Sequence, residues 1–139
     1  MLDNYRDLID ELLGTPSTLR ASLGGEGAPS PEVARLVAEL RDRDAAVLDR
    51  LQRLTREREP YLTPLAPAEP ATPASRDELL QSFDAARSEL VSLLMNLTLR
   101  DWERIGFEPS GEVRVADEVE RHVEFDEDHL ARLRAALGA

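Results

Sequence analysis

The chain has 139 residues, a size typical of one domain, and its net charge of −11 reflects 28 acidic residues against 17 basic ones, all Arg. This acidic balance disfavours nucleic-acid binding, and the lack of Cys excludes disulfides and Cys-ligated metal sites. The N-terminus lacks the pattern of a signal peptide, and no apolar run is long enough to span a membrane. We therefore expect one soluble, cytoplasmic domain over residues 1–139, with neither nucleic acid nor membrane as partner.

Apolar residues at helical spacing predict two helices in the first half of the chain. The first covers residues 2–23 and should be broken or kinked at Pro16, because proline lacks the backbone donor. Residues 24–29 contain three Gly and one Pro and should end this helix. Ser30 and Pro31 match an N-cap and the first helical position, so a second helix should run from there to about Arg58.

A proline-rich connector should separate the second helix from a third. Residues 59–74 hold five of the nine prolines, which argues against helix. Ser75 and Glu78 have the spacing of a capping box. The third helix should therefore begin after Ser75 and end near Trp102.

The last part of the chain should contain one loop and a fourth helix. Residues 105–115 include two Gly and one Pro, and their short EVRV stretch is too brief to predict a strand. Apolar periodicity then predicts a helix over residues 116–137. Four amphipathic helices around one core predict an all-α, up-down-type four-helix bundle.

Several polar residues fall on the apolar faces of these helices. Asp44 and Arg87 lie at the centres of the second and third stripes, and Asp126 lies within the fourth, with His122 and His129 one step to the side. A charge in a bundle core is costly unless it is paired, so Arg87 should bridge to Asp44, to Asp126 or to both. The alternative is a polar pocket between the helices that binds a ligand or a metal.

The two histidines alone are a weak indication of a metal site. His122 and His129 are seven positions apart on one helix, about 10 Å, which is too far to share one ion. Asp126 lies between them and could pair with either.

Three segments of the chain resemble the DinB/YfiT-like superfamily of four-helix-bundle proteins. They are VARLVAELRDRDAAVLDRL, FDAARSELVSLLMNLTLRDWERIGF and GEVRVADEVERHVEFDEDHLARLRAAL. The resemblance covers nearly the whole chain, including the Thr15–Pro16 pair in the first helix. It implies the same bundle fold that the periodicity predicts.

The resemblance also implies a position for a metal site. In that family three histidines typically bind a divalent ion such as zinc or nickel, one from the second helix and two from the fourth. The matching positions here are Glu39, Phe125 and His129. Phenylalanine has no lone pair to donate, so only Glu39 and His129 remain as ligands and the site is degraded.

These correspondences lead to two functional expectations. The family includes thiol transferases and metal-dependent hydrolases, and this chain is expected to be a non-catalytic or altered member that binds a small molecule without a cofactor. The alternative is an active metal-dependent transferase or hydrolase, in which Glu39, His129 and a nearby acid hold a divalent ion such as zinc or nickel. Because the family often forms homodimers through helix faces, the resemblance implies a homodimer as well.

Overall fold

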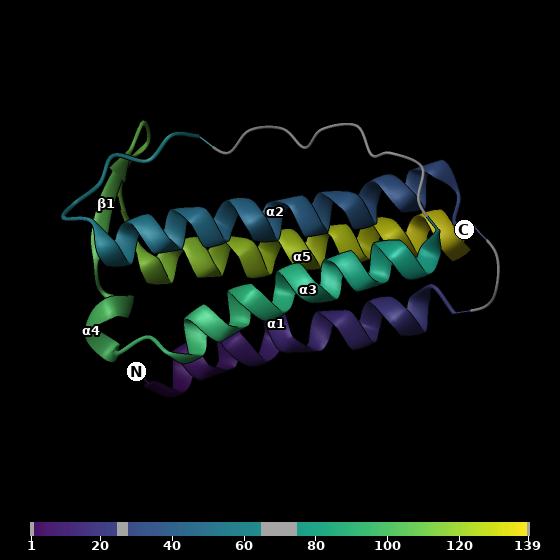
Figure 1. Cartoon of the computed structure of the whole chain (residues 1–139), viewed down its shortest axis with the longest axis horizontal. Helices are drawn as coiled ribbons and strands as arrows, with labels where there is room; N and C mark the ends of the chain where they lie inside the picture. Colours follow the sequence, from purple (N-terminus) through teal and green to yellow (C-terminus); the bar gives the residue numbers. More distant parts are fainter. Residues whose placement is uncertain (1, 25–27, 65–74, 139) are drawn as a thin grey trace.

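Four long helices form the body of the molecule. The structure is a computed structural model that describes residues 2–24, 28–64 and 75–138. The long helices are α1 (Leu2–Ser22), α2 (Pro31–Arg56), α3 (Arg76–Met95) and α5 (Val115–Gly138). A short helix and a hairpin join α3 to α5: α4 (Leu99–Trp102), β1 (Ile105–Glu108) and β2 (Gly111–Arg114) (Figure 1). The predicted all-α four-helix bundle is confirmed.

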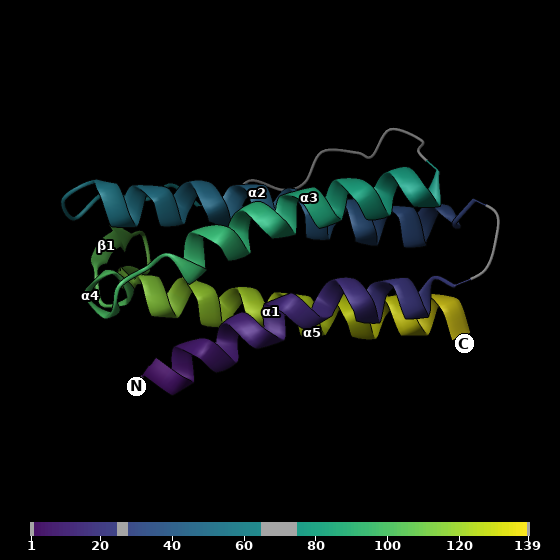
Figure 2. The ribbon, with the colours of Figure 1, turned by 60° about the horizontal axis from the view of Figure 1, so that its bottom comes forward.

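The helices form two layers, with α2 beside α3 and α1 beside α5 (Figure 2). Both α2 and α3 run in one direction and both α1 and α5 run in the other, so the order along the chain is up, down, down, up (Figure 1). Because α2 and α3 are parallel, α3 begins at the end of the bundle opposite to the one where α2 ends. Residues 65–74 of the connector between them, and residues 25–27 of the predicted stop after α1, lie outside the described part of the chain.

Serine caps begin α2 and α3 at the positions that the sequence predicts. The Ser30 hydroxyl accepts a hydrogen bond from the Val33 N–H, and the Ser75 hydroxyl accepts one from the Glu78 N–H. Each cap satisfies one of the N–H groups that the first helical turn leaves without a partner. The C-terminus of α2 lies at Arg56, two residues before the predicted end.

The prediction that the third helix extends to Trp102 is wrong. Helix α3 ends at Met95, and a separate short helix begins after Thr98. The Thr98 hydroxyl accepts from the Asp101 N–H, and the Asp101 carboxylate accepts from the Thr98 N–H, which is a capping box that restarts the helix. Trp102 is buried there and stacks on Tyr5 of α1, with ring centroids 4.6 Å apart.

The prediction of a loop over residues 105–115 is also wrong, because this segment forms a β-hairpin. Residues 60–62, which follow α2, pair with β1 of this hairpin: the Phe107 N–H donates to the Pro60 carbonyl, and the Leu62 N–H donates to the Phe107 carbonyl. At Gly106 a Cβ atom would lie 2.7 Å from both the Pro60 oxygen and Leu54 Cδ2, so only glycine permits this close approach. Contacts with residues far away in the sequence thus stabilise β1 and β2, which are too short to show the alternating pattern of a strand.

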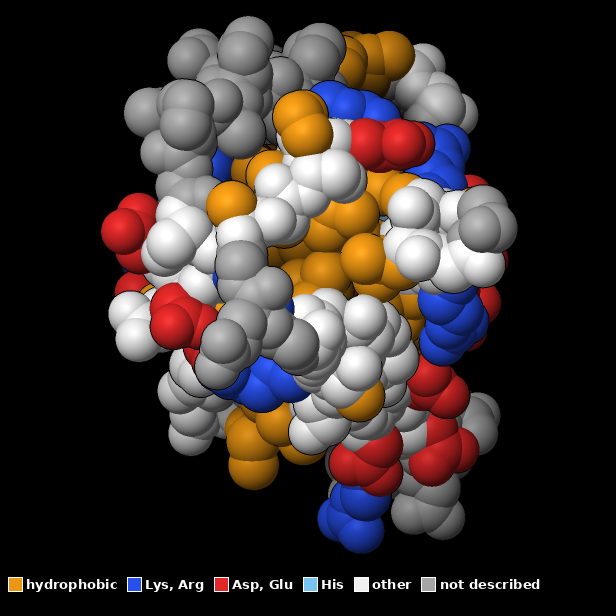
Figure 3. All heavy atoms as spheres, turned by 90° about the vertical axis from the view of Figure 1, so that its right-hand side faces the viewer, with side chains coloured by type: hydrophobic (Ala, Val, Ile, Leu, Met, Phe, Trp, Pro, Cys, Tyr) orange, Lys and Arg blue, Asp and Glu red, His pale blue; other side chains and the backbone are white. Residues whose placement is uncertain are grey.

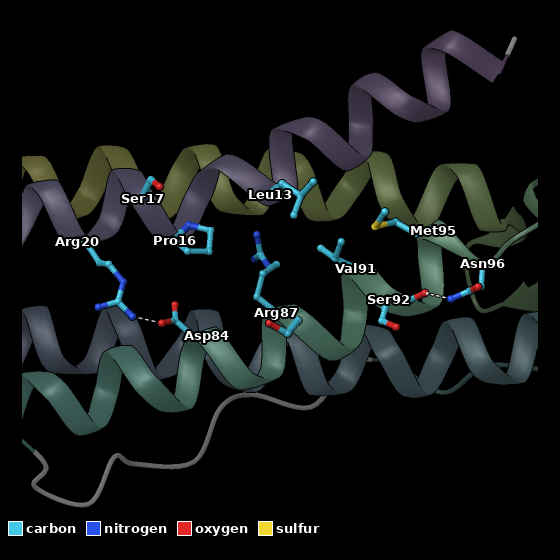
Figure 4. Close-up of a pocket in the computed structure, with 11 residues that line it drawn as sticks. Leu13, Pro16, Ser17, Arg20, Asp84, Arg87, Val91, Ser92, Met95 and Asn96 are labelled. Atoms are coloured by element: carbon cyan, nitrogen blue, oxygen red, sulfur yellow. Dashed lines mark hydrogen bonds and ion pairs between the residues drawn. The ribbon is translucent and has the colours of Figure 1, made fainter.

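Helix α1 is continuous across Pro16 but bends beside it. The ribbon changes direction between Leu13 and Pro16, where the two halves of the helix meet at an angle (Figure 4). The predicted kink is therefore present, and the alternative of a break is not.

The apolar core consists of two clusters, one toward the hairpin and one toward the opposite end of the bundle. Viewed from that opposite end, hydrophobic side chains gather at the centre and charged side chains lie toward the rim (Figure 3). Within the described ranges, none of the helices has both the length and the apolar character needed to cross a membrane. A layer of polar residues lies between the two clusters along the helices.

Candidate functional site

Each long helix contributes at least one buried residue to this polar layer, and α5 contributes His122 as a second one. The others are Thr15 of α1, Asp44 of α2, Arg87 of α3 and Asp126 of α5, and each is at most 4% exposed. Each one lies on its helix between a residue of the first apolar cluster and a residue of the second. The layer therefore crosses the whole bundle at mid-height.

Arg87 is the centre of the layer, and its guanidinium is saturated with hydrogen bonds. Nε and Nη2 donate to the two oxygens of Asp44, each at 2.9 Å. Nη1 and Nη2 donate to Asp126 at 2.7 and 2.8 Å, and Nη1 also donates to the Leu12 carbonyl at 2.8 Å. A guanidinium has five N–H donors, and all five are used here. Arg87 therefore has no donor left for a ligand.

The remaining acceptors of the layer are also engaged. The Thr15 hydroxyl donates to Asp126 Oδ2 at 2.7 Å, and His122 Nε2 lies 2.6 Å from Asp44 Oδ1. Burial opposes the charged form of Arg87, but the hydrogen bonds and charges of Asp126 and Asp44 outweigh it and raise the pKa of Arg87 above its ordinary value. The structure thus unites Asp44, Arg87, His122 and Asp126 in one buried, ion-paired cluster.

The three positions that match the metal ligands of the family lie together elsewhere, between α2 and α5. His129 Nε2 is 3.1 Å from Glu39 Oε1, and the Phe125 ring stacks on the His129 ring with centroids 4.0 Å apart. Asp126 pairs with neither histidine, since it contacts Arg87 and Thr15 instead. The two histidines therefore belong to different clusters, His122 to the polar layer and His129 to the α2–α5 contact.

The side chains between α2 and α5 do not fit a three-ligand metal site. Phe125 offers no donor atom, and His129 Nε2 already has the Glu39 carboxylate as partner. The acid and the histidine that could complete a set, Asp126 and His122, are held in the polar layer. In the described part of the chain, no three His, Asp or Glu side chains are grouped so that they could hold one ion.

Arg43 joins this contact and was not singled out from the sequence. Its guanidinium carbon lies 4.6 Å from the centroid of the Phe125 ring, and its Nε is buried without a hydrogen-bond partner. Burial lowers the pKa of Arg43. The negative charge of Glu118 opposes this shift, and the positive charges of Arg50 and Arg121 add to it. Its position four residues after Glu39, on the same face of the helix, is the signal that could have identified it.

A second buried ion cluster, also missed from the sequence, attaches the hairpin to α2 and α5. Arg50 donates to both oxygens of Glu118 at 2.8 and 3.0 Å and to Glu108 at 3.0 Å. Its remaining contact is with the Thr63 carbonyl at 2.6 Å. Arg121 reaches Glu108 from the solvent side at 2.6 Å. These four charged side chains balance one another.

A cleft of about 710 Å³ separates α1 from α3 (Figure 4). Leu13, Val91 and Met95 give it an apolar end, and Arg20 and Asp84 form an ion pair across it. Arg87 contributes to its wall but has no donor to spare. A second cleft of about 630 Å³ lies between α1 and α5 and reaches Asp126 and Thr15. Neither cleft includes Glu39, Phe125 or His129 among its lining residues.

Comparison with known proteins identifies the fold. No protein-family model matches the sequence, and no curated protein matches it significantly. Among solved structures, the chain is similar to YfiT from Bacillus subtilis, described as a probable metal-dependent hydrolase with an unusual four-helix bundle topology. The two chains are 16% identical, the match covers 99% of this chain and 90% of YfiT, and the TM-score is 0.78. This chain therefore has the DinB/YfiT-type four-helix-bundle fold.

Proposed function

We propose that this protein is a non-catalytic DinB/YfiT-type bundle that binds a small organic molecule at the contact between α2 and α5. In this proposal, the chain keeps the scaffold of YfiT, which is described as a probable metal-dependent hydrolase. Glu39, Phe125 and His129 stand at the positions expected for the metal ligands, and together they do not form a complete set of donors for an ion.

The stacking of Phe125 on His129 is the observation that carries the proposal. The ring, at the position that the resemblance assigns to the central ligand, lies 4.0 Å from the imidazole and contributes apolar surface in place of a nitrogen donor. Glu39 and His129 remain as a hydrogen-bonded pair at 3.1 Å. Polar groups beside an aromatic face are typical of small-molecule sites, in which apolar surface supplies affinity and a few polar groups supply orientation.

Metal content measured by elemental analysis tests this proposal. Protein purified without chelators should contain well under one equivalent of zinc or nickel. The same measurement on a His129→Ala variant should give the same low value, because no set of three ligands is lost with the imidazole.

Near-stoichiometric metal that disappears in His129→Ala would overturn the proposal. It would favour the alternative function, a metal-dependent transferase or hydrolase that uses Glu39, His129 and a nearby acid. Asp128 would be the acid to test next, because its carboxylate oxygen lies 3.9 Å from His129 Nδ1.

A further inference from the structure

Arg43 differs from the other arginines of the described chain in the way its charge is balanced. The other arginines that are at least partly buried each donate to an oxygen of a described residue: these are Arg41, Arg50, Arg53, Arg76, Arg87, Arg104 and Arg114. Arg43 is partly buried as well, yet no described residue accepts a hydrogen bond from it, and its Nε is fully enclosed. A buried polar group without a partner is rare, and a bound ion is one explanation for it.

The neighbouring carboxylates form their ion pairs with arginines other than Arg43. Glu108 and Glu118 are bound by Arg50 and Arg121, and Glu39 pairs with Arg35. None of these three carboxylates forms an ion pair with Arg43, although the negative charge of Glu118 acts on it from a distance.

Phe125 holds the guanidinium of Arg43 in a fixed place. The guanidinium carbon lies over the ring at 4.6 Å, a distance at which cation–π attraction operates. Stacking uses the flat face of the guanidinium, and Nε is enclosed, which leaves the edge formed by the two Nη groups for a ligand. That edge matches the two oxygens of a carboxylate or a phosphate in a bidentate contact.

We propose that Arg43, stacked on Phe125, binds the oxyanion group of the small molecule, either a carboxylate or a phosphate. This inference rests on the proposed function and names the class of its ligand. Phe125, at the position that the resemblance assigns to a metal ligand, would then hold an arginine that binds an anion. The site would bind a negatively charged group where the family binds a metal cation.

Benzoate, phenyl phosphate and benzamide are suitable probes, observed through the Arg43 Nε–H signal in nitrogen-15 NMR spectra. At low salt, both anions should shift this signal saturably, and neutral benzamide, which has the shape of benzoate, should not. The anion that binds more tightly distinguishes a carboxylate ligand from a phosphate ligand. A signal that moves with neither anion would overturn the inference.

Variants test whether the bound anion contacts Arg43 itself. Arg43→Gln should weaken binding at least about tenfold, and Arg43→Lys should bind at an intermediate level because it keeps the charge without the planar fork. Arg56→Gln is the matched control, since Arg56 is an exposed arginine of the same helix and its loss changes the net charge equally. Unchanged affinity in Arg43→Gln would overturn the inference.

The anion-binding test and the metal-content test can fail independently of each other. If the anions fail to bind while metal stays well below one equivalent, the inference fails and the metal-free assignment stands. If metal is stoichiometric and depends on His129, the proposed function itself fails.

Discussion

Arg87 of α3 donates a hydrogen bond from Nη1 to the main-chain carbonyl of Leu12 in α1, at 2.8 Å. In a regular helix this carbonyl would accept from the N–H four residues later, but that residue is Pro16, which has no N–H. The kink of α1 therefore leaves a carbonyl without its helical partner, and the buried arginine of another helix supplies the missing donor. The Thr15–Pro16 pair and Arg87 act as one structural unit.

Removal of the Arg87 side chain should destabilise the protein strongly. Arg87→Ala leaves the carboxylates of Asp44 and Asp126 buried without their cation, and the free energy of unfolding should fall by about 3–5 kcal/mol. Urea denaturation followed by circular dichroism measures this loss. Arg20→Ala is the control, since it breaks an ion pair that is largely exposed and should cost less than about 1 kcal/mol. Equal urea midpoints for Arg87→Ala and the parent would contradict the assignment of Arg87 to a buried ion-paired cluster.

Two glycines should respond to alanine in opposite directions. Gly106→Ala places a Cβ 2.7 Å from the Pro60 carbonyl oxygen and should destabilise the protein by about 1–3 kcal/mol. Gly14→Ala, inside α1 with no atom within 4 Å of the new Cβ, should stabilise it by about 0.5–1 kcal/mol. Thermal unfolding of both variants tests this, and a neutral Gly106→Ala would show that Pro60 does not pack against the hairpin.

The stability of the hairpin attachment should depend on pH in the acid range. Although burial alone would raise the pKa of Glu108, its hydrogen bonds to Arg121 and Arg50 outweigh burial and lower that pKa below the ordinary value. A lowered folded-state pKa means that this stabilisation is fully present above the unfolded pKa of about 4.3 and is lost as pH falls through the folded value.

Comparison of Glu108→Gln with the parent isolates this effect. The variant should unfold at lower denaturant than the parent at pH 7, and the difference should narrow as the pH falls below about 4. Exposed Glu112, on the same hairpin, provides the control Glu112→Gln, which should show no such narrowing. A difference for Glu108→Gln that stays constant down to pH 2.5 would refute the assignment of this stabilisation to the carboxylate.

The bundle and its polar layer could be predicted from the sequence because both follow from helical periodicity. Arg87, Asp44 and Asp126 fall at the centres of apolar stripes, and a charge in such a place requires a partner on a facing helix. The Leu12 contact could not be predicted, since it depends on how far Pro16 bends α1 and which side chain then reaches the carbonyl.

The parts that sequence reasoning missed depend on contacts between distant segments. The hairpin has strands of four residues, and its pairing relies on Pro60 and Leu62, some forty residues earlier in the chain. Arg43 resembles the other arginines of α2 in the sequence, and only packing against Phe125 of α5 distinguishes it. Local patterns contain no information on such pairings.

The central claim is that positions 39, 125 and 129 form the metal position of the fold and that Phe125, which has no donor atom, prevents a three-ligand site. Glu39, on α2, and Phe125, one turn before His129 on α5, both contact His129. The double variant Glu39→His with Phe125→His should therefore present three imidazoles to one ion, a donor set suited to zinc with one open position.

The most direct measurement is isothermal titration of this double variant with zinc, beside the parent and the two single variants. The double variant should bind one zinc ion at micromolar concentration, and its melting temperature should rise with added metal. The parent and Glu39→His alone, which lack a donor at position 125, should bind far more weakly. Phe125→His alone, with two imidazoles and the Glu39 carboxylate, should bind at an intermediate level. No binding by a folded double variant, or equally tight binding by the parent, would contradict the account.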